Sequence, residues 1–95
     1  MKLGRIVGTV GATRKDPSLS SLKLLVVENL TTSLGKEGGY VVAVDSVGAG
    51  VGEVVLYATG SSARLTAVTK DRPVDAVIMG IVDCFDVEGK SVSLA

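Results

Sequence analysis

The stretch DSVGAGVGEVVLYATGSSAR, residues 45–64, decides how the rest of the sequence is interpreted. It places the glycine-rich segment GAGVGE (48–53) before a β-branched apolar run and the segment GSSAR (60–64) after it. This arrangement is compatible with a phosphate-binding loop, with a nucleophile turn, or with a structural joint between strands. The first two roles need companion residues, and their presence can be checked along the chain.

The companion residues for phosphate binding and for nucleophilic catalysis are missing. GAGVGE has the spacing G-x-G-x-G and precedes a predicted strand, whereas a dinucleotide-binding loop opens a helix whose N-terminus faces the pyrophosphate. GSSAR has Arg64 where a nucleophile elbow has its second glycine, and the chain has no histidine to act as a base. We therefore interpret the glycines as turn positions that need a positive φ or a close backbone contact.

Metal binding and acid–base catalysis are also poorly supported. With no histidine and one cysteine, carboxylates are the main candidate ligands. The aspartates that could serve do not follow an EF-hand pattern, and no spacing selects a catalytic pair; they are Asp45, Asp75, Asp83 and Asp86. The sequence predicts no catalytic residue, no metal site and no cofactor.

The apolar residues indicate strands. Valine occurs seventeen times against ten leucines, and β-branched side chains favour strands. Five valine-rich runs are separated by turn-rich segments; they are 3–10, 22–30, 40–47, 53–59 and 74–87. We expect a mainly all-β fold, a small closed antiparallel five-stranded OB-like β-barrel, because closure removes exposed sheet edges.

The segments between the runs complete the predicted fold. A short helix is expected at 61–68, where a serine could cap the first turn, and a C-terminal hairpin is expected around the turn between Val87 and Val92. Asp16-Pro17 predicts a surface loop, and 31–39 predicts a polar one. Gly8 and Gly80 lie inside strand patterns and predict tight bends or close backbone approach. Cys84 is expected to be a buried free thiol.

Length, composition and charge restrict the class of protein. Ninety-five residues predict a single domain, 1–95, whose apolar content exceeds what so short a chain can bury, so we expect an oligomer. A formal net charge of zero argues against a nucleic-acid partner. The longest apolar stretch, 76–82, is too short to span a bilayer, so we expect no membrane association and a cytoplasmic location.

The sequence resembles a known family over nearly its whole length. The segments VAVDSVGAGVGEVVLYATGSSAR (42–64) and PVDAVIMGIVD (73–83), with the opening GTVGATRKDPSL (8–19), resemble the pentamer-forming EutN/CcmL vertex proteins of bacterial microcompartment shells. The resemblance implies a homopentamer that caps the vertices of a polyhedral shell built mainly of hexameric tiles. It implies a structural protein and not an enzyme.

The resemblance also implies where the chain makes contacts. Residues of the two segments would lie at subunit or shell-tile interfaces; they are Gly48, Ala49, Gly50, Gly52, Glu53, Ser61, Ser62 and Arg64. Arg64 and Glu53 have complementary charges, and we expect them to be candidate partners across an interface. Two alternatives stay open: an OB-type module that binds nucleic acid or a small anion, and an enzyme that uses carboxylates.

Overall fold

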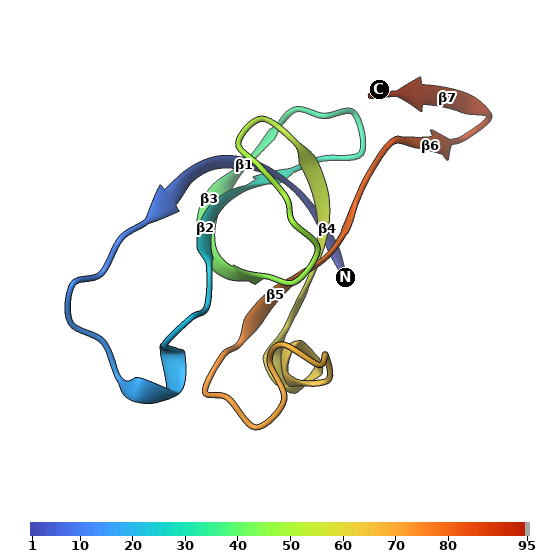
Figure 1. Cartoon of the computed structure of the whole chain (residues 1–95). Coiled ribbons are helices and arrows are strands. Elements are labelled where there is room, and N and C mark those ends of the chain that lie inside the picture. Colours follow the sequence, from blue (N-terminus) through green and yellow to red (C-terminus); the bar gives the residue numbers. More distant parts are fainter. Residues whose placement is uncertain (95) are drawn as a thin grey trace.

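The computed structural model describes residues 1–94, which form seven strands and two 3₁₀ helices (Figure 1). The strands are β1 (Lys2–Val10), β2 (Leu24–Leu30), β3 (Lys36–Asp45), β4 (Val54–Thr59), β5 (Ala76–Ile81), β6 (Cys84–Val87) and β7 (Lys90–Ser93). The 3₁₀ helices are η1 (Pro17–Leu19) and η2 (Gly60–Arg64). No helix within the described residues is long and apolar enough to cross a membrane.

Five strands close a barrel in the order β1-β2-β3-β5-β4, which confirms the predicted OB-like architecture. Four of the pairings are antiparallel. The fifth pairing, β3 with β5, is parallel and has only two residue pairs, Val44 with Val77 and Asp45 with Ile78. The pairing that closes the barrel at the end of β3 is therefore the shortest of the five.

Two groups of apolar side chains stabilise the chain. The inner group fills the barrel and consists of Ile6, Leu25, Val27, Ala43, Ala49, Val55, Tyr57, Ala76 and Ile78. The second group packs beneath η2 and the segment around η1; it consists of Val44, Ala58, Ala63, Val74 and Val77, with Leu19, Leu22 and Leu24 against them. Arg72 fixes the η1 segment, because its guanidinium donates hydrogen bonds to the carbonyls of Ser18 and Ser20.

Glycines in the barrel wall have distinct roles. Gly8 and Gly80 each border a β-bulge, one between Ile6 and Gly8 and one opposite Leu56 and Tyr57, which agrees with the predicted bends. Gly4 is the glycine of closest approach: a Cβ added there would overlap Val27 Cγ1 and lie 3.0 Å from the Glu28 carbonyl oxygen. β1 can therefore lie this close to Val27 and Glu28 of β2 only because residue 4 has no side chain.

Several boundaries differ from those expected. The apolar run 74–87 breaks at Val82 and Asp83 into β5 and β6, and β3 begins at Lys36, so that part of the expected 31–39 loop is strand. The helix after β4 is a single 3₁₀ segment, Gly60–Arg64, with no side-chain cap. Cys84 is exposed, so the prediction of a buried thiol was wrong. It begins β6, where the chain has already left the barrel.

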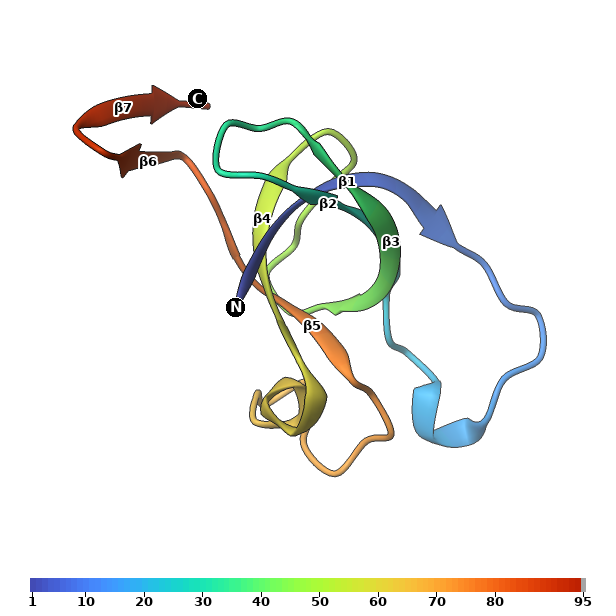
Figure 2. The same ribbon diagram turned by 180° about the vertical axis from the view of Figure 1, so that it is seen from behind.

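Two extensions give the molecule its 46 Å long axis. The hairpin β6–β7 projects from one side of the barrel and the loop joining β1 to β2 projects from the opposite side, as Figures 1 and 2 show. The hairpin turn at Glu88 and Gly89 has φ values of 49° and 78°, the left-handed geometry that suits a two-residue connection. The predicted C-terminal hairpin is thus confirmed.

Tyr57 provides a pH-dependent measure of barrel integrity. Its hydroxyl donates a hydrogen bond to Asn29 Oδ1, and burial, followed by the negative charge of Glu37, raises the pKa of its phenol. A raised pKa means that the folded state favours the neutral phenol, so Tyr57 contributes to the stability of the fold. This contribution is complete below pH 10 and is lost as the pH rises through the pKa that Tyr57 has in the folded state. At neutral pH, Tyr57→Phe is expected to cost about 1 kcal/mol.

The difference in thermal stability between wild type and Tyr57→Phe should become smaller as the pH rises. Thermal unfolding followed from pH 7 upward should show wild type and Tyr57→Phe converging above about pH 10, because only wild type loses this contribution. Tyr40→Phe is the matched control, since the Tyr40 side chain is 66% exposed. A constant difference across the whole pH range would contradict the account of Tyr57.

Candidate functional site

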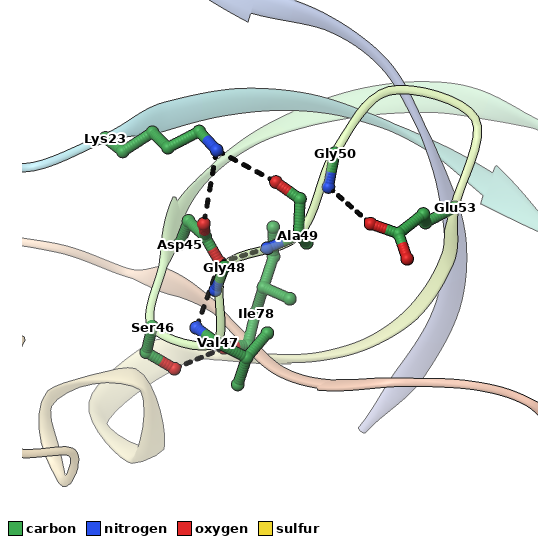
Figure 3. Close-up of polar contacts among 9 residues, drawn as sticks. All are labelled: Lys23, Asp45, Ser46, Val47, Gly48, Ala49, Gly50, Glu53 and Ile78. Carbon is green, nitrogen blue, oxygen red and sulfur yellow. Dashed lines mark hydrogen bonds and ion pairs between the residues drawn. The ribbon is translucent and has the colours of Figure 1, made fainter.

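The loop between β3 and β4 folds around the side chain of Asp45. The backbone amides of Val47, Gly48 and Ala49 donate to Asp45 Oδ1 at 3.0, 3.1 and 3.2 Å (Figure 3). An aspartate that accepts amides from the residues that follow it is the usual Asx-turn geometry. This one side chain directs the chain out of β3 and into the glycine-rich segment.

Lys23 holds the same loop from the end of the long β1–β2 connection. Its Nζ donates to the Ala49 carbonyl at 2.9 Å and lies 3.6 Å from Asp45 Oδ2 (Figure 3). The Asp45 side chain is only 4% exposed, so the ion pair is partly shielded from solvent. The loop is therefore fixed both by the last residue of β3 and by a cation from a distant part of the sequence.

The far half of the loop is tied to β1. Gly50 donates its amide to Glu53 Oε1 at 2.6 Å, Gly52 donates to the Ile6 carbonyl at 2.8 Å, and Ile6 donates to the Glu53 carbonyl at 3.0 Å. Gly48 and Gly52 have φ values of +78° and +94°. The predicted turn role of these two glycines is confirmed, because an L side chain would be strained at both positions.

The loop presents a mixed surface. Ala49 is 1% exposed and belongs to the inner apolar group, so its side chain closes the barrel core and does not face outward. Val51 lies at the outer part of the loop and is 63% exposed. The solvent-facing surface of this segment therefore consists of Val51, the flanking glycine backbone and the half-buried Glu53.

GSSAR forms η2, which follows β4. Ala63 is buried in the second apolar group, whereas Ser61, Ser62 and Arg64 are exposed. Within residues 1–94 the side chains of these three exposed residues make no hydrogen bond or ion pair. Leu65, directly after η2, is 84% exposed, more than any other large apolar side chain described.

The two segments lie at opposite ends of β4. Six extended residues separate them by about 20 Å. The structure therefore does not bring Glu53 and Arg64 together within one chain. Their pairing stays a prediction about contacts between copies.

The geometry argues against an anion site in the glycine loop. An anion bound there would need free amides, but those of Val47, Gly48 and Ala49 already donate to Asp45 and that of Gly50 donates to Glu53. The described part of the chain also has no group of three or more histidine, cysteine or carboxylate side chains placed to hold a metal ion. The amides of residues 47–50 are already hydrogen-bonded to Asp45 and Glu53, so the loop is better suited to a fixed contact surface than to ligand binding.

Sequence reasoning missed the residues that hold this loop. Lys23 and Asp45 were not expected to act together, because twenty-one residues lie between them. The recognisable part of the signal is an aspartate at the end of a predicted strand, followed after two residues by glycine. The partner lysine is recognisable only once β2 and β3 are paired.

Comparisons with known proteins find relatives of this chain. Residues 1–83 match the family model EutN_CcmL, described as ethanolamine utilisation protein EutN/carboxysome. The shell vertex protein GrpN of Rhodospirillum rubrum (strain F11) is 49% identical over 83 residues, 87% of this chain and 93% of that protein.

Solved structures give the same result. The structure of Gloeobacter violaceus CcmL has a TM-score of 0.93 at 40% identity and covers 98% of this chain and 97% of that one. The structure described as the GrpN pentameric microcompartment shell protein from Rhodospirillum rubrum has a TM-score of 0.83 at 47% identity. It covers 92% of this chain and 100% of that one.

Proposed function

Because this chain belongs to the EutN/CcmL family, we propose that five copies form a ring that closes the vertices of a polyhedral microcompartment shell. The protein is a structural shell vertex protein and not an enzyme, and its place is the shell itself. The observation that carries the proposal is the likeness to a pentameric shell protein along that protein's whole length.

The exposed apolar surface supports assembly. Tyr40, Val51 and Leu65 are 66%, 63% and 84% exposed, and Val42 is 49% exposed. Apolar area of this kind is costly in water, and burial between subunits recovers about 25 cal/mol for each Å² covered. A ring in which each copy covers its neighbour supplies this burial five times.

We extend the proposal to the two segments around β4. The segment 48–53 and the exposed residues of η2, Ser61, Ser62 and Arg64, would contact neighbouring subunits or hexameric shell tiles. The support is that the loop is held by several internal hydrogen bonds, and that the exposed η2 side chains have no partner within residues 1–94. Ala49 would act only by fixing the loop, because its side chain is buried.

Electron microscopy of shells tests the vertex role. Hexameric shell proteins expressed with this chain should form closed polyhedra, and without it they should form shells with open vertices or extended sheets. Adding purified chain to the open shells should close them. Equal closure in the presence and absence of the chain would contradict the proposal.

Arg64 gives a residue-level prediction. Arg64→Ala should lower the thermal stability of the oligomer and shift it toward smaller species, because a carboxylate or carbonyl across the interface loses its guanidinium donor. Lys70→Ala, another exposed cation outside β4 and η2, is the control. Unchanged native mass and unchanged thermal midpoint for Arg64→Ala would remove Arg64 from the interface.

The alternative of an OB-type binding module is not favoured. Nucleic-acid binding by such barrels needs a basic groove with aromatic stacking platforms. Here the formal net charge is zero, and Tyr57 is buried in the barrel. The relatives are shell vertex proteins, which favours the structural role.

A further inference from the structure

The C-terminal hairpin is joined to the barrel only loosely. β6 and β7 form a separate two-stranded sheet, and its base is closed by the Leu94 amide donating to the Asp83 carbonyl at 2.8 Å. A hairpin of two strands is marginally stable in water unless something packs against it. The family model ends at residue 83, but the likeness to the structure of Gloeobacter violaceus CcmL covers 98% of this chain, so it takes in the hairpin as well.

The hairpin is also acidic. Its register places Phe85 opposite Val92, whereas Asp86 is opposite Ser91 on the other face. Residues 82–94 contain three acidic residues, Asp83, Asp86 and Glu88, and one basic residue, Lys90. The exposed carboxylates of Asp83 and Asp86 form no ion pair within the described residues.

The extension on the opposite side of the barrel has the complementary charge. Residues 11–23 contain three basic residues, Arg14, Lys15 and Lys23, and one acidic residue, Asp16. Lys23 is held by Asp45, and Asp16 accepts from Ser18, whereas Arg14 and Lys15 are exposed and form no ion pair with the described residues. The cations of this loop that have no ion-pair partner, Arg14 and Lys15, therefore lie at its outer part.

A ring joins different surfaces of successive copies. In a head-to-tail assembly one flank of each subunit meets the opposite flank of the next. Figures 1 and 2 place the hairpin and the β1–β2 loop on such opposite flanks. We propose that the β6–β7 hairpin of one copy docks on the Gly11–Asp16 part of the β1–β2 loop of the next copy. This inference rests on the proposed ring.

Charge reversal tests the contact. The hairpin variant is Asp83→Lys with Asp86→Lys, and both positions lie outside the strained turn at Glu88 and Gly89. The loop variant is Arg14→Glu with Lys15→Glu, and the rescue protein combines all four changes. Glu37→Lys with Asp75→Lys reverses two exposed acidic residues elsewhere and is the matched control.

Sedimentation velocity over a dilution series, with circular dichroism to verify folding, gives the readout. Each double variant should raise the concentration at which the ring dissociates by at least about tenfold relative to the control, and the rescue protein should restore it. At about 0.5 M salt the difference between wild type and each double variant should shrink, because screening weakens exposed charge pairs.

The outcomes separate the contact from the ring. A wild-type pentamer whose dissociation is the same in the hairpin variant and the control overturns the hairpin contact and leaves the proposed function intact. A weakened hairpin variant that the loop changes fail to rescue overturns the loop as the docking partner. A wild-type protein that is monomeric overturns the ring, and this inference with it.

Discussion

Replacing Gly4 with alanine is expected to destabilise the barrel by about 1–3 kcal/mol, the usual cost of overfilling a packed wall. The added Cβ would overlap Val27 Cγ1 and would lie 3.0 Å from the Glu28 carbonyl oxygen and 3.3 Å from Tyr57 Cε1. Two of these neighbours leave little room to adjust, since one is backbone and the other is a ring in the inner apolar group. β1 would have to move away from β2.

Denaturant unfolding at one fixed protein concentration measures the effect, since assembly also stabilises the fold. Gly8→Ala is the control in the same strand: its Cβ would lie 3.8 Å from the nearest atom, Val26 Cβ, an ordinary contact. Gly80→Ala is a second control, with no atom within 4 Å of the added Cβ. Equal stability of Gly4→Ala and the two controls would contradict the close-approach role of Gly4.

Removing the Asp45 carboxylate is expected to have the other large effect. Asp45→Ala leaves three amides without their acceptor and Lys23 without its counter-ion. Loss of several charge-assisted hydrogen bonds at a largely covered carboxylate should cost about 2–4 kcal/mol. Because Ala49 is part of the inner apolar group, the loop cannot move without opening the barrel core.

Hydrogen exchange and thermal unfolding measure this effect together. The amides of Val47, Gly48 and Ala49 should exchange faster in Asp45→Ala, and Asp45→Asn should be intermediate because it keeps one acceptor oxygen. Asp75→Ala is the control, because Asp75 is exposed and its carboxylate has no hydrogen bond with the described residues. Unchanged exchange at these three amides would show that the loop is held by something other than Asp45.

The fold was largely predictable from the sequence, and the boundaries less so. Valine-rich runs separated by turns predict the five barrel strands, since β-branched periodic segments carry their signal locally. The break at Val82 and Asp83 was missed because apolar residues continue through it and only the end of the barrel stops the pairing. The exposure of Cys84 follows from that break.

The candidate site was predictable only where its signal comes from residues adjacent in sequence. Positive φ at Gly48 and Gly52 agrees with the turn interpretation, which depends on residues adjacent in sequence. Gly4 was not recognised, because its importance depends on Val27 and Tyr57, which reach it only when the barrel closes. The partners of Ser61, Ser62 and Arg64 belong to another copy or another protein in our proposal, so one chain does not define them.

Native mass spectrometry of the wild-type chain tests the central claim most directly. The chain has a mass of 9.7 kDa, and the ring proposed here predicts a dominant species of five times that mass which persists on dilution. A species of five copies is the result expected if fivefold closure is the function of this protein. A stable monomer, dimer or hexamer under the same conditions would contradict the account.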